Sequence, residues 1–126
     1  MPTTNKKKLL VIRFSALGDV TMLAPVLQEF IQQNPDIEVY VVSRPFMQAI
    51  FKQFPQIKFI PVDIDKKYKG IFGLYQLYRE LKQYNFDYVA DLHSVIRSKI
   101  ITKFFQFNKT KTATLDKGHK EKKALI

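Results

Sequence analysis

Cysteine is absent from this chain of 126 residues, which excludes disulfide bonds and thiolate metal sites. The absence is compatible with a reducing compartment. No run of about 18 apolar residues is present, so no membrane-spanning helix is predicted. The basic start leads into a short apolar run, Leu9 to Ile12, that Arg13 ends at once, so no signal peptide is predicted either. We therefore expect a cytoplasmic location.

Negative charge is also scarce. Lys and Arg number 21 against 11 Asp and Glu, which gives a net charge of +10 at pH 7. Such a surplus favours an anionic partner, which could be nucleic acid, a phosphorylated substrate or an anionic membrane surface. Lysines that only keep a domain soluble are the alternative, because many of them are scattered along the chain.

Hydrophobic residues make up 46% of the chain, enough to bury a core, and the length fits one domain, residues 1–126. Short apolar runs alternate with patterns of helical periodicity, which predicts a Rossmann-like α/β fold: a parallel sheet with helices on both faces. Pro25 predicts a kink or a late start of the first helix, and Pro61 an edge position or a strand end. The strands are expected at 9–12, 37–42, 57–62, 87–92 and 112–115, and the helices at 19–33, 45–54, 71–84 and 94–105.

Ligands of open parallel sheets bind beyond the carboxyl ends of the strands, near the point where the strand order reverses. The segment 13–20 leaves the first strand towards such a place. In it, Gly18 would permit a tight turn and close approach of a ligand. Asp19, at the predicted helix start, either caps the helix or acts as a base that takes a proton from an alcohol.

This loop lacks the G-x-G-x-x-G and G-K-[ST] patterns, so it is not predicted to bind nucleotide phosphates. An anionic acceptor that bears a hydroxyl fits better, with Arg13 as an anion contact. The sequence shows neither metal-ligand spacing nor a Ser-His-Asp set, so no metal is expected.

The segment 91–98 leaves the fourth predicted strand. His93 is either an acid–base residue or donor to a ligand, or a structurally bonded histidine. Arg97 lies in the first turn of the next helix, where an arginine and free main-chain N–H groups favour an anion. Ser94 is predicted to cap that helix. Arg44 follows the second strand, so Arg13, Arg44 and Arg97 either converge on one cleft or each pair with a local carboxylate.

The segment from Leu9 to Phe30, LLVIRFSALGDVTMLAPVLQEF, resembles the opening motif of glycosyltransferase family 9, the ADP-heptose:lipopolysaccharide heptosyltransferases. Later pieces agree in order and spacing. They are a strand ending near Arg44-Pro45, DLHSVIRS at Asp91 to Ser98, and the lysine-rich LDKGHKEKKAL near the end. The chain departs from the family in this second motif, because the family often has Gly or Asn after the His or Gln, whereas this chain has Ser94-Val95.

The resemblance implies the N-terminal half of a GT-B enzyme, which has two Rossmann-like domains across a cleft. This half would bind the anionic lipopolysaccharide-precursor acceptor, and a C-terminal domain would bind ADP-heptose or a related nucleotide-sugar. Transfer would be inverting and would need no metal or other cofactor. Asp19 would be the catalytic base, and the acceptor-binding residues would be Arg13, Ser15, Gly18, Arg44, His93 and Arg97.

The apolar ending Ala124-Leu125-Ile126 is typical of a cut inside a longer protein, so we expect the donor-binding domain to be missing. The isolated part should be inactive, and self-association is expected because loss of a partner domain exposes apolar surface. We also expect docking on the inner membrane face by charge rather than by insertion, through Lys66 to Lys69, Lys103 and the C-terminal lysines.

A different class of function is a basic Rossmann-like module that binds nucleic acid or a small anion without catalysis. Aromatic residues interleaved with lysines, as in KKYKGIFGLYQLYR, could stack on bases. Their helical spacing favours core packing instead, so no nucleic acid is expected.

Overall fold

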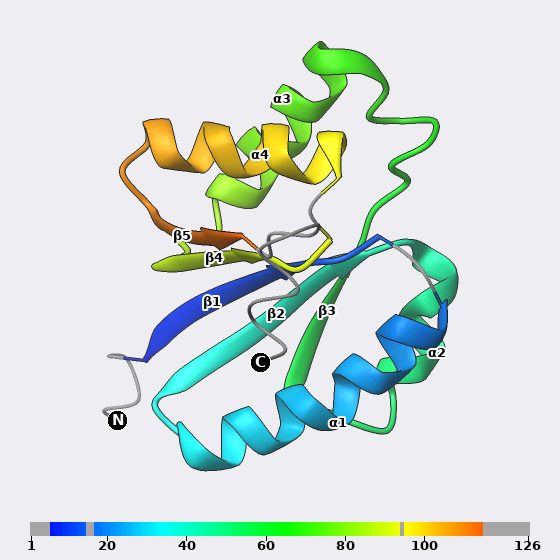
Figure 1. Cartoon of the computed structure of the whole chain (residues 1–126), viewed down its shortest axis with the longest axis vertical. Coiled ribbons are helices and arrows are strands. Elements are labelled where there is room, and N and C mark those ends of the chain that lie inside the picture. The colour runs from blue at the N-terminus through cyan, green and yellow to red at the C-terminus, as the bar shows by residue number, and fades with distance from the viewer. Residues whose placement is uncertain (1–5, 15–16, 94, 115–126) are drawn as a thin grey trace, which may run out of the picture.

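The computed structural model of the chain describes residues 6–14, 17–93 and 95–114, with side chains described for 6–14, 21–93 and 95–113 (Figure 1). Strands and helices alternate along these residues. In order they are β1 (Lys7–Ile12), α1 (Leu17–Gln33), β2 (Ile37–Ser43), the 3-10 turn η2 (Pro45–Met47), α2 (Gln48–Phe51), β3 (Ile57–Pro61), α3 (Gly70–Lys82), β4 (Tyr88–Asp91), α4 (Ile96–Phe107) and β5 (Lys111–Thr114).

The strands form one parallel sheet in the order β3-β2-β1-β4-β5. The chain builds outward from β1 to β3 and then crosses back to place β4 on the other side of β1. The strand order therefore reverses between β1 and β4. In this kind of sheet the crevice beyond the carboxyl ends of those two strands is where ligands bind.

The helices cover both faces of the sheet, as predicted. Figure 1 shows α1 and α2 beneath the sheet and α3 and α4 above it. Leu27 and Ala24 of α1 pack with β1 and β2 in one apolar cluster, and Leu77 and Phe105 of α3 and α4 belong to the other. Because β1 is covered on both faces, its run Leu10 to Ile12 is fully buried, which explains the continuous apolar pattern.

The first helix differs from the prediction. It begins at Leu17, earlier than the expected Asp19, and it continues through Pro25, so the late start is wrong. Pro25 is exposed, while Ala24 and Leu27 beside it are buried, so packing of that stripe on the sheet keeps the segment helical. The early start makes Gly18 and Asp19 the second and third helical residues.

The other differences are small shifts of boundaries. Pro61 is the last residue of β3, which lies at the edge of the sheet, so both expectations for this proline are confirmed. The expected helix at 45–54 is a 3-10 turn followed by the single helical turn α2. Within the described part of the chain, no helix is long and apolar enough to cross a bilayer. Most of the lysine-rich end, residues 115–126, lies outside the described residues.

Candidate acceptor and catalytic site

The segment that leaves β1 is bound to the segment that leaves β4. A guanidinium nitrogen of Arg13 donates to the main-chain carbonyl of Leu92. The Phe14 amide donates to Nδ1 of His93 at 3.3 Å, and the ring of Phe14 is fully buried. These contacts hold the two strand exits side by side at the point where the sheet order reverses.

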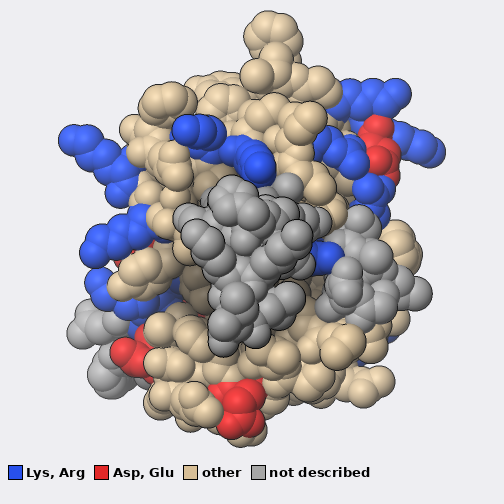
Figure 2. Space-filling view, viewed as in Figure 1, with Lys and Arg blue, Asp and Glu red and all other residues tan. Residues whose placement is uncertain are grey.

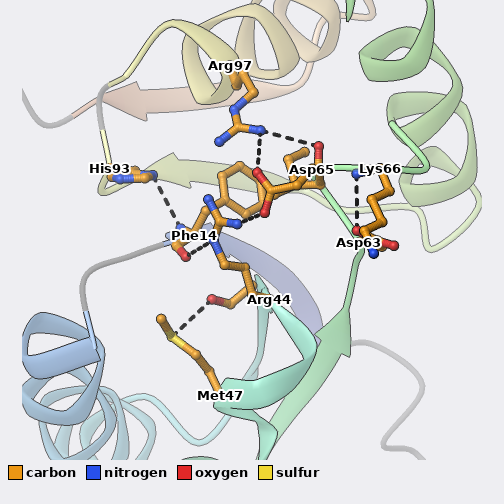
Figure 3. Close-up of polar contacts among 10 residues, drawn as sticks. Phe14, Arg44, Met47, Asp63, Asp65, Lys66, His93 and Arg97 are labelled. Carbon is orange, nitrogen blue, oxygen red and sulfur yellow. Dashed lines mark hydrogen bonds and ion pairs between the residues drawn. The ribbon is translucent and has the colours of Figure 1, made fainter. Parts of the chain in front are cut away.

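Arg44, directly after β2, joins the same edge (Figure 3). Its Nε–H donates to the Phe14 carbonyl at 2.9 Å, and its guanidinium forms an ion pair with Asp65. Arg97, in the first turn of α4, lies 3.2 Å from the same carboxylate and donates to the Ile64 carbonyl at 3.3 Å. Asp65 therefore holds together two arginines that come from opposite halves of the sheet.

The two predictions for these arginines, convergence and pairing with a carboxylate, are thus combined in one arrangement. One carboxylate faces two guanidinium groups, so the cluster keeps a net positive charge. Burial, and then the like charge of Arg97, lower the pKa of Arg44 below its ordinary value. The side chains of Arg97 and Asp65 stay 38% and 53% exposed, so a ligand could reach this cluster from solvent. Arg13 is instead held at the Leu92 carbonyl, and an acceptor contact by Arg13 stays a prediction.

Asp91, the last residue of β4, lies at the centre of a buried polar network. Its side chain is fully buried, and its Oδ1 accepts from the His93 amide at 3.0 Å. The Ser98 hydroxyl lies 3.0 Å from Oδ2, and it also accepts from the Val95 amide at the start of α4. A buried carboxylate is tolerated because these donors replace its water. The network fixes where α4 begins, and with it the position of Arg97.

His93 makes structural contacts in this arrangement, and a contact with an acceptor stays a prediction. Its side chain is only 8% exposed, and its ring lies edge-on to Phe14 at 6.0 Å between centroids. Because Nδ1 accepts a hydrogen bond from the Phe14 amide, the neutral ring carries its proton on Nε2. Any donation from His93 to an acceptor would therefore use Nε2–H.

The remaining predicted residues are described only in part. Asp19 is the third residue of α1, so it does not occupy the N-cap position that sequence reasoning allowed it. Gly18 lies inside the first helical turn rather than in the preceding turn. Side-chain positions at 15–20, and Ser15 and Ser94 altogether, lie outside the described residues. The α4 helix begins with Ile96, and Ser98 binds the Val95 amide there.

Sequence reasoning missed Asp65 and assigned no role to Asp91. Asp65 lies in a charged loop far along the chain from both arginines, and no local pattern marks it. A signal for Asp91 did exist, since an aspartate at the end of an apolar strand must find hydrogen-bond donors when it is buried.

Among the residues that the structure describes, no group of three or more His, Asp or Glu side chains is placed to hold a metal ion.

A second basic region lies at the opposite, amino end of the strands. An open pocket of about 700 Å³ is bordered there by Arg79, Lys82 and Lys109, with Asp87 as its acidic residue. Figure 2 shows that Lys and Arg side chains spread over much of the visible face rather than gathering in one patch. Charge alone therefore does not select the site, whereas the arrangement of Arg44, Asp65 and Arg97 at the reversal of strand order does.

Comparison with known sequences points to one family. No family model matches the chain, but two curated proteins do. It is 30% identical over 101 residues to lipopolysaccharide heptosyltransferase 1 of Campylobacter coli, a match that spans 80% of this chain and 29% of that protein. It is 27% identical over 100 residues to the lipopolysaccharide core heptosyltransferase OpsX of Haemophilus influenzae, spanning 79% and 28%.

The chain is a relative of the family 9 heptosyltransferases. The resemblance found in the motifs is thereby confirmed, although this chain spans less than a third of the length of either relative.

Solved structures show the fold of this heptosyltransferase relative. A family 9 glycosyltransferase from Veillonella parvula superimposes with a TM-score of 0.72 at 24% identity, over 87% of this chain and 36% of that one. The E. coli heptosyltransferase WaaC, solved with ADP-2-deoxy-2-fluoro heptose, gives 0.63 at 22% identity, over 86% and 35%. The expected Rossmann-like fold of a GT-B glycosyltransferase is thus confirmed.

Proposed function

We propose that this chain is the N-terminal, acceptor-binding domain of an inverting glycosyltransferase. The enzyme would transfer a heptose-like sugar from an ADP-sugar to the lipopolysaccharide inner core, and a C-terminal domain would bind the donor. Both sequence relatives are lipopolysaccharide heptosyltransferases, and the E. coli structural neighbour was solved with an ADP-heptose analogue. These findings support the proposal.

The observation that carries the proposal is the pair of arginines at the reversal of strand order. Arg44 and Arg97 share the Asp65 carboxylate, keep a net positive charge and stay partly exposed. Guanidinium groups bind carboxylate and phosphate groups through paired N–H donors. An acceptor that carries such groups would replace or join Asp65 at these arginines, with its hydroxyl directed towards the exit of β1.

Asp19 would act as the base in this reaction. Its carboxylate takes the proton from the acceptor hydroxyl as that oxygen bonds to the anomeric carbon of the donor. The bond between the anomeric carbon and the ADP oxygen breaks, and ADP leaves with the electron pair. Attack opposite the leaving group inverts the anomeric configuration. The main-chain position of Asp19, in the first turn of the helix that follows β1, supports this assignment.

The experiment is a transfer assay on the complete enzyme with Asp19→Asn. Loss of the carboxylate base should reduce turnover by at least about 100-fold, while acceptor affinity changes little. Asp36→Asn is the matched control, because Asp36 is an exposed aspartate just before β2, at the opposite end of the sheet. Turnover of Asp19→Asn close to that of Asp36→Asn would reject the assignment of the base.

The proposed acceptor is a membrane lipid, so the enzyme would work at the inner face of the cytoplasmic membrane as a peripheral protein. Lys66, Lys67 and Lys103 are exposed and support attraction to anionic lipid. Sedimentation with vesicles tests this: binding should require anionic lipid and should weaken with salt. Equal sedimentation with zwitterionic vesicles would contradict it.

The alternative of nucleic-acid binding is not favoured. Of the four aromatic residues in the segment that could stack on bases, Tyr68 and Tyr78 are buried at 4% and 6% exposure, and only Phe72 and Tyr75 are exposed. Tyr78 packs edge-on against Phe105 at 4.9 Å between centroids, inside the core. A gel shift with mixed oligonucleotides should show no binding that resists salt.

A further inference from the structure

Exposed apolar residues begin helix α3 and have no role in the arginine cluster. Phe72 is 88% exposed and Ile71 57% exposed, and Tyr75, one turn further on, is 46% exposed. Residues three and four apart share a helix face, so these three side chains form one apolar surface. We call it the α3 tip. Exposed apolar surface that is bordered by polar residues is typical of sites that contact a protein or a membrane.

Lysines lie in the loop directly before the α3 tip. The preceding loop carries Lys66, Lys67 and Lys69, all exposed. Its two acidic residues are outnumbered: Asp63 accepts from the Lys66 amide at 3.1 Å, and Asp65 is already paired with the two arginines. Cations therefore dominate this end of the molecule. In Figure 2 an uncharged projection rises at the end where α3 begins, with Lys and Arg side chains below and beside it.

The tip is held rigidly, so its exposure does not come from loose packing. A Cβ on Gly73 would lie 2.4 Å from the Tyr68 carbonyl carbon, so only glycine lets α3 pack this closely on the loop. The Tyr68 ring is buried, and its hydroxyl donates to Glu80 at 2.5 Å. Gly70 has a φ of +69°, which favours glycine at the start of the helix. Rigid presentation lowers the entropy cost of docking.

In place of the docking by charge alone that the sequence predicts, we propose that the α3 tip inserts into an anionic bilayer surface, with Ile71 and Phe72 among the upper acyl chains and Lys66, Lys67 and Lys69 on the headgroups. This combination of basic and apolar side chains fits the boundary between headgroups and acyl chains. The inference rests on the proposed function for its purpose. The loop that bears the lysines also bears Asp65, so insertion brings the Arg44–Arg97 cluster close to the surface from which a lipid-linked acceptor extends.

Insertion of one aromatic residue can be observed directly, because the chain contains no tryptophan. Phe72→Trp places a single fluorescent reporter in the tip. Phe107→Trp is the matched control, since Phe107 is 81% exposed at the far end of α4. Vesicles of phosphatidylethanolamine and phosphatidylglycerol should shift the emission of Phe72→Trp to the blue, and brominated lipid should quench it. Phe107→Trp should show neither effect. Equal responses, or no response from Phe72→Trp, would overturn the proposal.

Vesicle sedimentation then measures the contribution of each group. Phe72→Ser should lower the partition coefficient by about tenfold and Phe107→Ser by less than about twofold. Each of Lys66→Gln and Lys67→Gln should lower it by about fivefold. Because Phe72 is exposed, its serine variant should fold normally, which its thermal unfolding checks. A Phe72→Ser variant that partitions like the unmodified chain would overturn the insertion. Self-association of the unmodified chain that Phe72→Ser abolishes would also overturn the insertion, because a second copy of the chain would then cover the tip.

Failure of this inference is distinguishable from failure of the proposed function. A transfer assay on a water-soluble acceptor without its lipid should be unaffected by Phe72→Ser in the complete enzyme. Transfer to that acceptor without any vesicle insertion would reject membrane insertion of the α3 tip but would agree with the proposed glycosyltransferase function. Insertion without acceptor binding or transfer would reject the proposed glycosyltransferase function but would agree with membrane insertion of the α3 tip.

Discussion

At the carboxyl ends of the strands the key contacts are polar. Asp91 accepts from the His93 amide and the Ser98 hydroxyl, and Asp65 joins two arginines. At the amino ends aromatic rings pack together instead. The ring of Phe86 stacks on that of Tyr84 at 5.4 Å between centroids. Its centroid lies 6.5 Å from that of Phe105.

Both ends carry basic residues, so the difference lies in how those residues are held. At the amino end, cations border an open pocket near the last turns of α3 and α4. Helix C-termini disfavour anions there. At the carboxyl end, the guanidinium groups are fixed by carbonyls and a carboxylate, and helix N-termini face the same edge. Fixed geometry, rather than charge, therefore distinguishes the proposed acceptor site from the amino end.

The largest expected effect is on packing at the amino end. Phe105→Ala removes a ring that is 1% exposed and should lower the free energy of unfolding by about 4 kcal/mol. Phe107→Ala, two positions along the same helix, should change it by less than about 0.5 kcal/mol. Urea denaturation measures both. Similar losses would mean that aromatic packing does not stabilise this end.

The next effect concerns the polar network at the carboxyl end. Asp91→Ala leaves the buried His93 amide without this acceptor and leaves the Ser98 hydroxyl only the Val95 carbonyl, and should cost up to about 3 kcal/mol. Asp36→Ala, at an exposed aspartate, should stay within about 0.5 kcal/mol. If Asp91→Ala is as stable as the Asp36 variant in urea, the network does not fix the start of α4.

Substitutions at the two ends should also differ in their effect on acceptor binding, by a smaller free energy than in the unfolding experiments. Arg97→Ala should weaken binding of an anionic inner-core oligosaccharide about tenfold, or about 1.4 kcal/mol. Arg79→Ala removes an exposed arginine at the amino end and should change affinity less than about twofold. Isothermal titration measures both variants on this chain. An equal loss from Arg79→Ala would assign the binding to general charge.

The last effect is one of pH, at the loop that holds the α3 tip. Burial, followed by the hydrogen bond and the charge of Glu80, raises the pKa of Tyr68 from 10.0 to about 12. The resulting stabilisation is complete below pH 10 and is lost as the pH rises towards 12, where the folded hydroxyl ionises. Unfolding free energy should therefore fall over this range, and Tyr68→Phe should make the fall smaller. An unchanged slope would exclude ionisation of Tyr68 as its cause.

Much of the fold could be predicted because its signals are local. The continuous apolar run at Leu10 to Ile12 marks a strand that is covered on both faces, and the stripe of Ala24 and Leu27 marks the helix that covers one of them. The start of α1 could not be placed from sequence. The proline rule predicted a kink or a late start at Pro25, but the helix begins before it, and burial of the stripe beside it keeps the segment helical.

The candidate site was predictable only where residues lie in the segments that lead from a strand to the next helix. Arg44 and Arg97 were found in this way, and the structure brings them together. Asp65 was not found, because it meets both arginines through the return of a loop that has no pattern of its own. The partners of His93 were missed for the same reason, since Phe14 binds its ring from another strand exit.

The most direct test is to map the contact surface of the chain with its acceptor. Amide chemical shifts of the 126-residue chain can be followed as an anionic inner-core oligosaccharide is added. We predict shifts at Phe14, Arg44 and Arg97, at the carboxyl ends of the strands, and none at Lys82 or Lys109. Shifts confined to the amino end, or spread evenly over the basic surface, would contradict the account.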